Sequence, residues 1–292
     1  MQSIETSLRN VEKGKREAAF QMVHALSKIK GIEAIVLGGS QARGTANQDS
    51  DVDLGIYYLE KSPPSIDELR ILAERFCTSS PVVTQFYEWG PWVNGGAWIN
   101  TQAGKFDWLY RNLRSVRQVI EDAKQGRFSW DYRQQPPYGF FSVMFLADLQ
   151  QNISLYDPNQ SFLRLKEESR VFPEPLRRAM VQEHLWSVEF SYFQARKSIR
   201  RKSIYETAGC MTRIAAELNQ VLFALNRTYF ATERTALETI ETFSLKPRDY
   251  ANRICEYLGS PGKNGSLEKW NELIQDTIQL SQRLYTPKYI LS

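Results

Sequence analysis

The chain has 292 residues, of which 42% are hydrophobic and 24% are charged, and its 37 Lys and Arg residues slightly outnumber its 33 Asp and Glu residues. A chain of this length and apolar content can bury a core, which excludes intrinsic disorder, collagen-like repeats and a disulfide miniprotein. The net charge of +4 is too small to indicate a partner. Cys77, Cys210 and Cys255 are odd in number and widely spaced, so we expect free thiols and a cytoplasmic protein.

The first part of the chain mixes helical and strand patterns. Apolar residues recur every three or four positions from Ile4 to about Ile29, which predicts a helix that Gly31 ends. Short β-rich runs predict strands or β-prone segments at Glu33 to Leu37, Val52 to Tyr58, Val82 to Trp89, and a hairpin of Ala97 to Asn100 with Lys105 to Tyr110. A further helix is expected at Ile66 to Phe76.

Strand signals end in the sequence after Pro136-Pro137, and helical periods follow. Helices are expected at Phe140 to Leu155, Glu174 to Ile199, Ile204 to Tyr229, Pro247 to Leu258 and Leu267 to Leu284. No apolar stretch is long enough to cross a bilayer, so no membrane insertion is expected. We therefore predict an α+β fold: a domain over residues 1–135 with a mixed sheet flanked by helices, then an all-α helical bundle over residues 136–292.

A glycine-rich turn follows the first expected strand. Gly38 and Gly39 lack a Cβ, so the backbone can turn tightly and its N–H groups can approach a phosphate closely. Ser40 stands where a helix would begin, and its hydroxyl can cap that helix or donate to a phosphate. Arg43 follows three residues later, and its guanidinium suits a phosphate, although a surface arginine is an equal alternative.

Two acidic residues begin the second expected strand. Asp51 and Asp53 are two positions apart, so the pleat of a strand points both carboxylates out of the same face. Such a pair attracts a cation, and Mg²⁺ in proteins is usually held by one or two carboxylates plus the phosphates of the substrate. A nucleoside triphosphate would complete such a site.

A third acid lies in the aromatic run KFDWLY. Asp107 would be costly to bury there without a metal or a partner, and three carboxylates on neighbouring strands suffice for two metal ions. An ordinary ion pair between Asp107 and Arg111 is the alternative. Glu88 is a rival third ligand or a general base, although an exposed glutamate at the end of a strand is the favoured alternative. It precedes a segment whose tryptophans could stack on a base or pack the hairpin onto the helical bundle.

The segment GGSQARGTANQDSDVDL resembles the signature of the DNA polymerase β-like nucleotidyltransferase superfamily. The resemblance implies that Gly38, Gly39 and Ser40, with Arg43, bind the triphosphate. It also implies that Asp51, Asp53 and a third acid on a later strand, Asp107 with Glu88 as its rival, bind the metal and are catalytic. The helical second half makes the chain similar to two-domain antibiotic nucleotidyltransferases that modify aminoglycosides and lincosamides.

These features predict a Mg²⁺-dependent transfer, with two ions, of a nucleoside monophosphate, AMP from ATP or another nucleotide, to a hydroxyl of a small antibiotic-type acceptor in the helical domain. The lack of excess acid there favours a neutral hydroxylated acceptor over a cationic one, and the lack of a broadly basic domain disfavours nucleic acid. A transferase acting on RNA or protein is an alternative. Another is a catalytically idle nucleotide-binding or antitoxin-like module. The oligomeric state is open, with a homodimer as one arrangement.

Overall fold

The chain is described by a computed structural model over residues 4–259 and 265–289. Its contacts divide it into two compact units. The sheet unit comprises Met1–Glu121 and Phe145–Val171, and the helical unit comprises Asp122–Met144 and Phe172–Ser292. The sequence predicts one boundary after residue 135. In the structure, residues 122–135 group with the helical unit and Phe145–Val171 groups with the sheet unit. The α+β class is confirmed, since a mixed sheet with helices is followed by a helical region.

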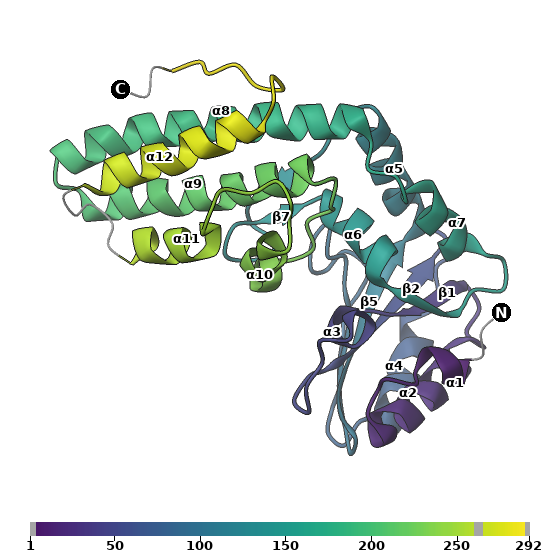
Figure 1. The fold of residues 1–292 in the computed structure, drawn as a ribbon. Helices are drawn as coiled ribbons and strands as arrows, with labels where there is room; N and C mark the ends of the chain where they lie inside the picture. Colours follow the sequence, from purple (N-terminus) through teal and green to yellow (C-terminus); the bar gives the residue numbers. More distant parts are fainter. Residues whose placement is uncertain (1–3, 260–264, 290–292) are drawn as a thin grey trace. The chain divides into compact units, whose positions relative to one another are not determined.

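The sheet unit is built on a six-stranded sheet (Figure 1). Its strands lie in the order β3-β4-β5-β2-β1-β8. Their bounds are β1 Ile32–Leu37, β2 Val52–Tyr58, β3 Val82–Val83, β4 Gly96–Thr101, β5 Gly104–Asn112 and β8 Ile153–Tyr156. The neighbours β2 and β5 are parallel, and all the other neighbours in this sheet are antiparallel. The predicted strands at Val52 to Tyr58 and in the hairpin are therefore present.

Helices pack on the apolar face of the sheet. Alternate residues of β2, among them Val52, Leu54 and Ile56, are fully buried in a core shared with α2 (Lys13–Leu26) and α4 (Ile66–Phe76). The helix expected from Ile4 to Ile29 is interrupted: α1 is only Ile4–Ser7, and α2 begins after Glu12. The Glu12 carboxylate accepts from the first amides of α2, and this cap separates the two helices.

The opposite face of β2 carries Asp53, Gly55 and Tyr57, because successive side chains of a strand alternate between faces. Tyr57 packs edge-on against Phe162, with ring centroids 5.3 Å apart. Phe162 belongs to α7 (Ser161–Glu168), which lies in the same segment as most of α6 (Val143–Gln151). The polar positions predicted on β2 therefore lie on the face that this returning segment covers. Helix α5 is Leu113–Lys124.

Two segments differ from the sequence expectations. Only Val82–Val83 of the β-prone run to Trp89 forms a strand. The single helix expected from Phe140 to Leu155 is instead β7 (Phe140–Phe141), α6 and β8. Strand β8 pairs with β1, with Ser154 opposite Val36. Pairing with the open edge of β1 supplies the backbone hydrogen bonds there, and this non-local gain overrides the local helical period.

The helical unit contains long helices that lie side by side (Figure 1). Its elements are α8 Glu174–Arg200, α9 Ile204–Leu225, η1 Glu233–Thr235, α10 Ala236–Glu241, α11 Tyr250–Leu258, α12 Ser266–Leu280 and a small ribbon of β6 Trp130–Asp131 with β7. Val188 of α8, Leu218 of α9 and Trp270 of α12 have no exposed surface. The helices α8, α9 and α12 contact one another, and these buried side chains belong to the core of the helical unit.

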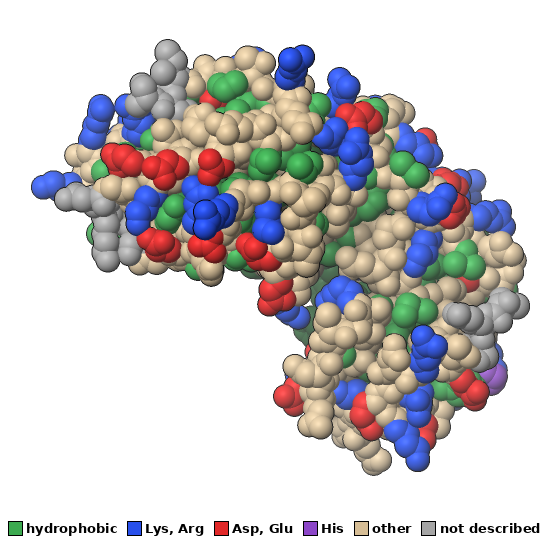
Figure 2. All heavy atoms as spheres, viewed as in Figure 1, with side chains coloured by type: hydrophobic (Ala, Val, Ile, Leu, Met, Phe, Trp, Pro, Cys, Tyr) green, Lys and Arg blue, Asp and Glu red, His purple; other side chains and the backbone are tan. Residues whose placement is uncertain are grey.

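The surface of the helical unit carries both signs of charge. Figure 2 shows Lys and Arg side chains interspersed with Asp and Glu side chains over the face in view. The three cysteines are free thiols, as expected. None of the helices in the described ranges is long and apolar enough to cross a membrane.

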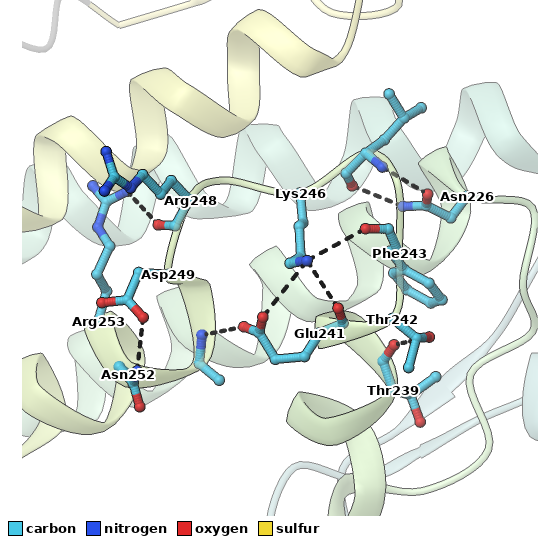
Figure 3. Close-up of polar contacts among 12 residues, drawn as sticks. Asn226, Thr239, Glu241, Thr242, Phe243, Lys246, Arg248, Asp249, Asn252 and Arg253 are labelled. Atoms are coloured by element: carbon cyan, nitrogen blue, oxygen red, sulfur yellow. Dashed lines mark hydrogen bonds and ion pairs between the residues drawn. The ribbon is translucent and has the colours of Figure 1, made fainter.

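Polar contacts fix the connection between α10 and α11 (Figure 3). Lys246 Nζ donates to the carbonyl of Glu241 at 2.8 Å and lies 3.6 Å from its carboxylate. Asn226, which caps the end of α9, exchanges two side-chain hydrogen bonds with the backbone of Leu245. The connection is thereby tied to the end of α9.

Candidate active site

The glycine turn packs directly against Asp53. The Gly38 amide donates to the Asp53 carbonyl at 2.9 Å, and Gly39 adopts a φ of +60°. A side chain at position 39 would place its Cβ only 1.7 Å from Asp53 Oδ2. Glycine is therefore required here twice over, by the left-handed backbone and by the close approach of the carboxylate.

Ser40 and Arg43 lie on the short helix α3 (Gly39–Arg43) that follows the turn. Both are half-buried. The Nε atom of Arg43 is buried without a hydrogen-bond partner in the described part of the chain. Its positive charge opposes the factors that raise the pKa of Asp53. The structure therefore brings all four residues predicted to bind a triphosphate to the side of this carboxylate.

Asp53 and Asp107 are register partners on the parallel strands β2 and β5. Burial raises the pKa of Asp53, and the charges of Asp148 and Asp51 raise it further. Burial likewise raises the pKa of Asp107, to about 6, with contributions from the charges of Asp53 and Asp51. The three carboxylates predicted from the sequence thus act on one another electrostatically, as like charges in a partly desolvated site do.

A buried lysine, Lys15, forms hydrogen bonds with the loop that precedes Asp51. Lys15 is 7% exposed, and its Nζ donates to the carbonyls of Gln48 and Ser50 at 2.6 and 2.8 Å. The Ser50 hydroxyl in turn bonds to Asn47 at 3.0 Å. These contacts fix the backbone of the loop that leads into Asp51. The sequence pattern did not predict this role of Lys15.

Glu88 lies apart from the carboxylate pair. Its side chain is exposed and accepts from the Gln85 amide at 2.7 Å, so it closes a local turn. Burial raises the pKa of Tyr110, and the charge of Glu88 adds to the rise. Tyr110 lies on the opposite face of β5 from Asp107. The tryptophans of this region pack on protein rings: Trp89 stacks on Trp98 with centroids 4.9 Å apart.

Sequence reasoning missed Asp148 and Arg111 as members of the site. Arg111 was considered as an ion-pair partner of Asp107, but it pairs with Asp148 at 3.2 Å and its side chain is only 10% exposed. Asp148 reaches the site from α6, and its charge is the largest coulombic influence that raises the pKa of Asp53. Nearby, Asn152 Oδ1 would lie 3.3 Å from a Cβ at position 38. The sequence did contain one signal for Asp148, since this acid lies within the longest apolar stretch, Tyr138 to Leu149.

The chemistry of the carboxylates fits a divalent cation. Burial is the main cause of the raised pKa values of Asp53 and Asp107, and repulsion between carboxylates adds to it. Carboxylate oxygens are hard ligands, and a bound cation would relieve that repulsion. Over residues 4–259 and 265–289, however, no three acidic, histidine or cysteine side chains stand together in a metal-ligating group. The carboxylates are therefore neighbours on the sheet without forming a preassembled set of ligands.

The solved structures that resemble the chain include the following two proteins. One is a nucleotidyltransferase-like protein from Exiguobacterium sibiricum, with a TM-score of 0.44 and 12% identity, where the match covers 96% of this chain and 75% of that one. The other is spectinomycin adenyltransferase from Enterococcus faecialis, solved with ATP and spectinomycin. Its TM-score is 0.32 and its identity 12%, over 89% of this chain and 99% of that one. No curated protein matches the sequence.

Two protein families match separate parts of the chain. Residues 141–233 match a domain of unknown function, DUF4037, and this match contains Asp148. Residues 21–85 match the nucleotidyltransferase domain. That second match contains the glycine turn, Asp51 and Asp53, and it confirms the prediction that the chain is a nucleotidyltransferase enzyme.

Proposed function

We propose that the enzyme transfers AMP from ATP to a hydroxyl of a small, neutral, antibiotic-type acceptor presented by its helical part. The observation that carries the proposal is the position of Asp53, packed against the Gly39 turn on one side and in register with Asp107 on the other. A turn suited to phosphate thus adjoins a pair of acids on one sheet face. In the transfer, the acceptor hydroxyl gives its proton to Asp107 and its oxygen forms a bond to the α-phosphorus. The bond between the α-phosphorus and the oxygen that bridges to the β-phosphate breaks, and pyrophosphate leaves.

The residues of the site divide this work between them. The Gly39 amide, the Ser40 hydroxyl and Arg43 bind the triphosphate, because N–H groups and a guanidinium suit phosphate oxygens. Gly38 contributes to the tight turn, since its own amide donates to the Asp53 carbonyl. Asp51, Asp53 and Asp107 would hold Mg²⁺, which when bound neutralises charge on the triphosphate and pyrophosphate. Asp107 also orients the attacking hydroxyl. The Arg111–Asp148 ion pair fixes the polar surroundings of Asp53.

The test is the transfer of label from α-labelled ATP, with Mg²⁺, to pooled hydroxylated small molecules. Asp53→Asn is expected to abolish transfer, whereas Asp49→Asn, a matched change in the exposed loop before the strand, is expected to retain it. Full transfer by Asp53→Asn, or equal loss in both variants, contradicts the assignment. Acceptor binding that weakens steeply with salt would instead indicate a nucleic-acid acceptor.

A second candidate is a nucleotide-binding module without turnover. It requires only the glycine turn and Arg43, whose charge acts on Asp53 beside that turn. The two candidates differ in one result. Nucleotide binding that is lost in Arg43→Gln, together with no label transfer to any pooled acceptor, would favour the module over the enzyme.

A further inference from the structure

The helical unit contains a pocket of about 740 Å³. Residues from the β6–β7 ribbon, α8, α9 and the segment after α12 line it, and all of them belong to this unit. The volume lies in the range typical of small-molecule sites, which are commonly lined by aromatic side chains with a few convergent polar groups. The pocket contains none of the residues assigned to nucleotide transfer.

A buried polar cluster forms one wall of the pocket. Glu217 of α9 is 6% exposed and accepts hydrogen bonds from His184 Nδ1 and, at 3.1 Å, from the Ser187 hydroxyl, both on α8. Arg213 donates to the same hydroxyl at 3.0 Å. Burial alone would raise the pKa of Glu217, but the charge and hydrogen bond of His184, with the charge of Arg213, lower it below its ordinary value. The wall therefore contains an ionised carboxylate.

Burying this polar cluster between α8 and α9 costs free energy of desolvation. Apolar residues of similar size at a helix interface are often neutral or stabilising relative to a buried ion pair. The Nε2 atom of His184 is also buried without a hydrogen-bond partner in the described chain. Buried ionisable groups beside a pocket are a common mark of a functional site, because stability alone does not require them.

Aromatic rings form a second wall. The His184 ring stacks on Phe128 with centroids 5.3 Å apart and 28° between the planes. Trp130 lies nearly parallel to Phe141, with 5.8 Å between centroids and 8° between planes. The Arg213 guanidinium lies 5.8 Å from the Trp130 ring. Flat faces of this kind suit a planar ligand, which stacks on rings with little loss of conformational freedom.

The charges at the pocket favour an anion. Arg213, Arg283 and Lys288 line it together with Glu183 and Glu217. Glu217 accepts hydrogen bonds from His184 and Ser187 and lies 3.8 Å from the Arg213 guanidinium. Of the lining side chains, this leaves the exposed cations Arg283 and Lys288 with the exposed acid Glu183, while the buried Glu189, outside the lining, accepts from the Tyr285 hydroxyl and the Lys288 amide. A positive surplus beside a low-dielectric aromatic wall attracts an acidic group.

We infer that this pocket binds a small planar aromatic molecule that carries an acidic group. The aromatic wall takes the ring, and Arg283 and Lys288 take the anion. The site goes beyond the proposed transfer of AMP, and its occupancy requires neither nucleotide nor metal. It can therefore be tested separately from the proposed function.

The test compares two fluorescent probes with the same ring system on the full, folded chain. Anilinonaphthalenesulfonate carries an acidic group and N-phenylnaphthylamine does not. We expect the sulfonate to bind one equivalent and to quench tryptophan emission. The uncharged probe should bind at least about tenfold more weakly, a difference of about 1.4 kcal/mol in binding free energy. Equal affinity of the two probes, or sulfonate binding without saturation at one equivalent, would overturn the inference.

A charge-neutralising variant locates the site. Arg283→Gln combined with Lys288→Gln is expected to weaken sulfonate binding about tenfold and to leave binding of the uncharged probe unchanged. The matched control, Arg200→Gln combined with Lys202→Gln, removes two exposed cations of the same unit that do not line the pocket, and it should bind both probes as the parent does. Unchanged sulfonate affinity in the first variant, or an equal loss in the control, overturns the assignment.

Discussion

Asp53 on β2 lies directly across the parallel register from Asp107 on β5. Burial raises the pKa of both carboxyls, and the charge of Asp53 raises the pKa of Asp107 further. Two half-buried acids side by side weaken a fold rather than strengthen it, because folding then requires the desolvation of like charges. The arrangement is explained by a ligand that both acids share.

Replacing Asp53 by Asn should therefore separate activity from stability. The folded-state pKa of Asp53 is raised, so its ionised form costs stability at every pH above the unfolded pKa, and an amide removes that cost. We expect Asp53→Asn to melt at the same or a higher temperature at neutral pH while transfer falls by about a thousandfold. Thermal melts and initial rates, measured on one preparation, check both parts. A large fall in melting temperature would contradict the electrostatic account.

The glycine turn offers a matched pair of substitutions. Gly39→Ala combines a φ of +60° with a Cβ 1.7 Å from Asp53 Oδ2, so we expect a cost of about 1–3 kcal/mol and a loss of transfer. Gly44→Ala has a similar φ of +72° but nothing within 4 Å, so it should cost about 1 kcal/mol and retain activity. Denaturant unfolding and rate measurements distinguish them. Equal activity in the two variants would show that the contact with Asp53 is unimportant.

We expect Lys15 to affect kcat indirectly, through the loop that precedes Asp51. Lys15→Met leaves the carbonyls of Gln48 and Ser50 without their buried donor and loosens the loop before Asp51. We expect a loss of about 1–3 kcal/mol in stability and a fall in kcat of about ten- to a hundredfold. Lys13→Met, on the exposed side of the same helix, is the control and should change neither. A variant that unfolds more easily but turns over normally would limit Lys15 to a structural role.

A pH-dependent prediction concerns Glu233 in the helical unit. Burial raises the pKa of Glu233 to about 7, and one of its oxygens is buried without a partner in the described chain. Ionisation therefore disfavours the folded state, starting above the unfolded pKa near 4.5 and reaching its full effect above about 7. Glu233→Gln should stabilise the protein by about 2 kcal/mol at pH 8 and by nothing at pH 4. Exposed Glu238→Gln is the control and should show no such pH dependence.

The local parts of the site could be predicted from the sequence. The turn at Gly38 and the acids of β2 lie within one short stretch, so their chemistry depends on spacing that the sequence displays directly. The partnership of Asp53 with Asp107 required only the guess that their strands are neighbours, and the register bears that guess out. The helix Ile66–Phe76 was likewise set by a local amphipathic period.

The parts of the fold and the site that could not be predicted depend on contacts between segments that lie far apart in the sequence. Asp148 acts on Asp53 from a segment far along the sequence, and its place within an apolar run does not indicate which strand it will approach. Strand β8 was misread as helix because its four residues form a strand by pairing with β1 rather than by their own periodicity. Lys15 resembled an ordinary surface lysine on an amphipathic helix, since its carbonyl partners lie in a loop that only the fold brings near.

The return of Phe145–Val171 to the sheet unit has a consequence for biosynthesis. A nascent chain that has emerged only as far as Glu121 has no partner for the outer edge of β1, because that partner, β8, is encoded later. The ribosome must release residues through Tyr156 before the sheet can be completed. A chain cut after residue 135 would therefore contain neither unit in full.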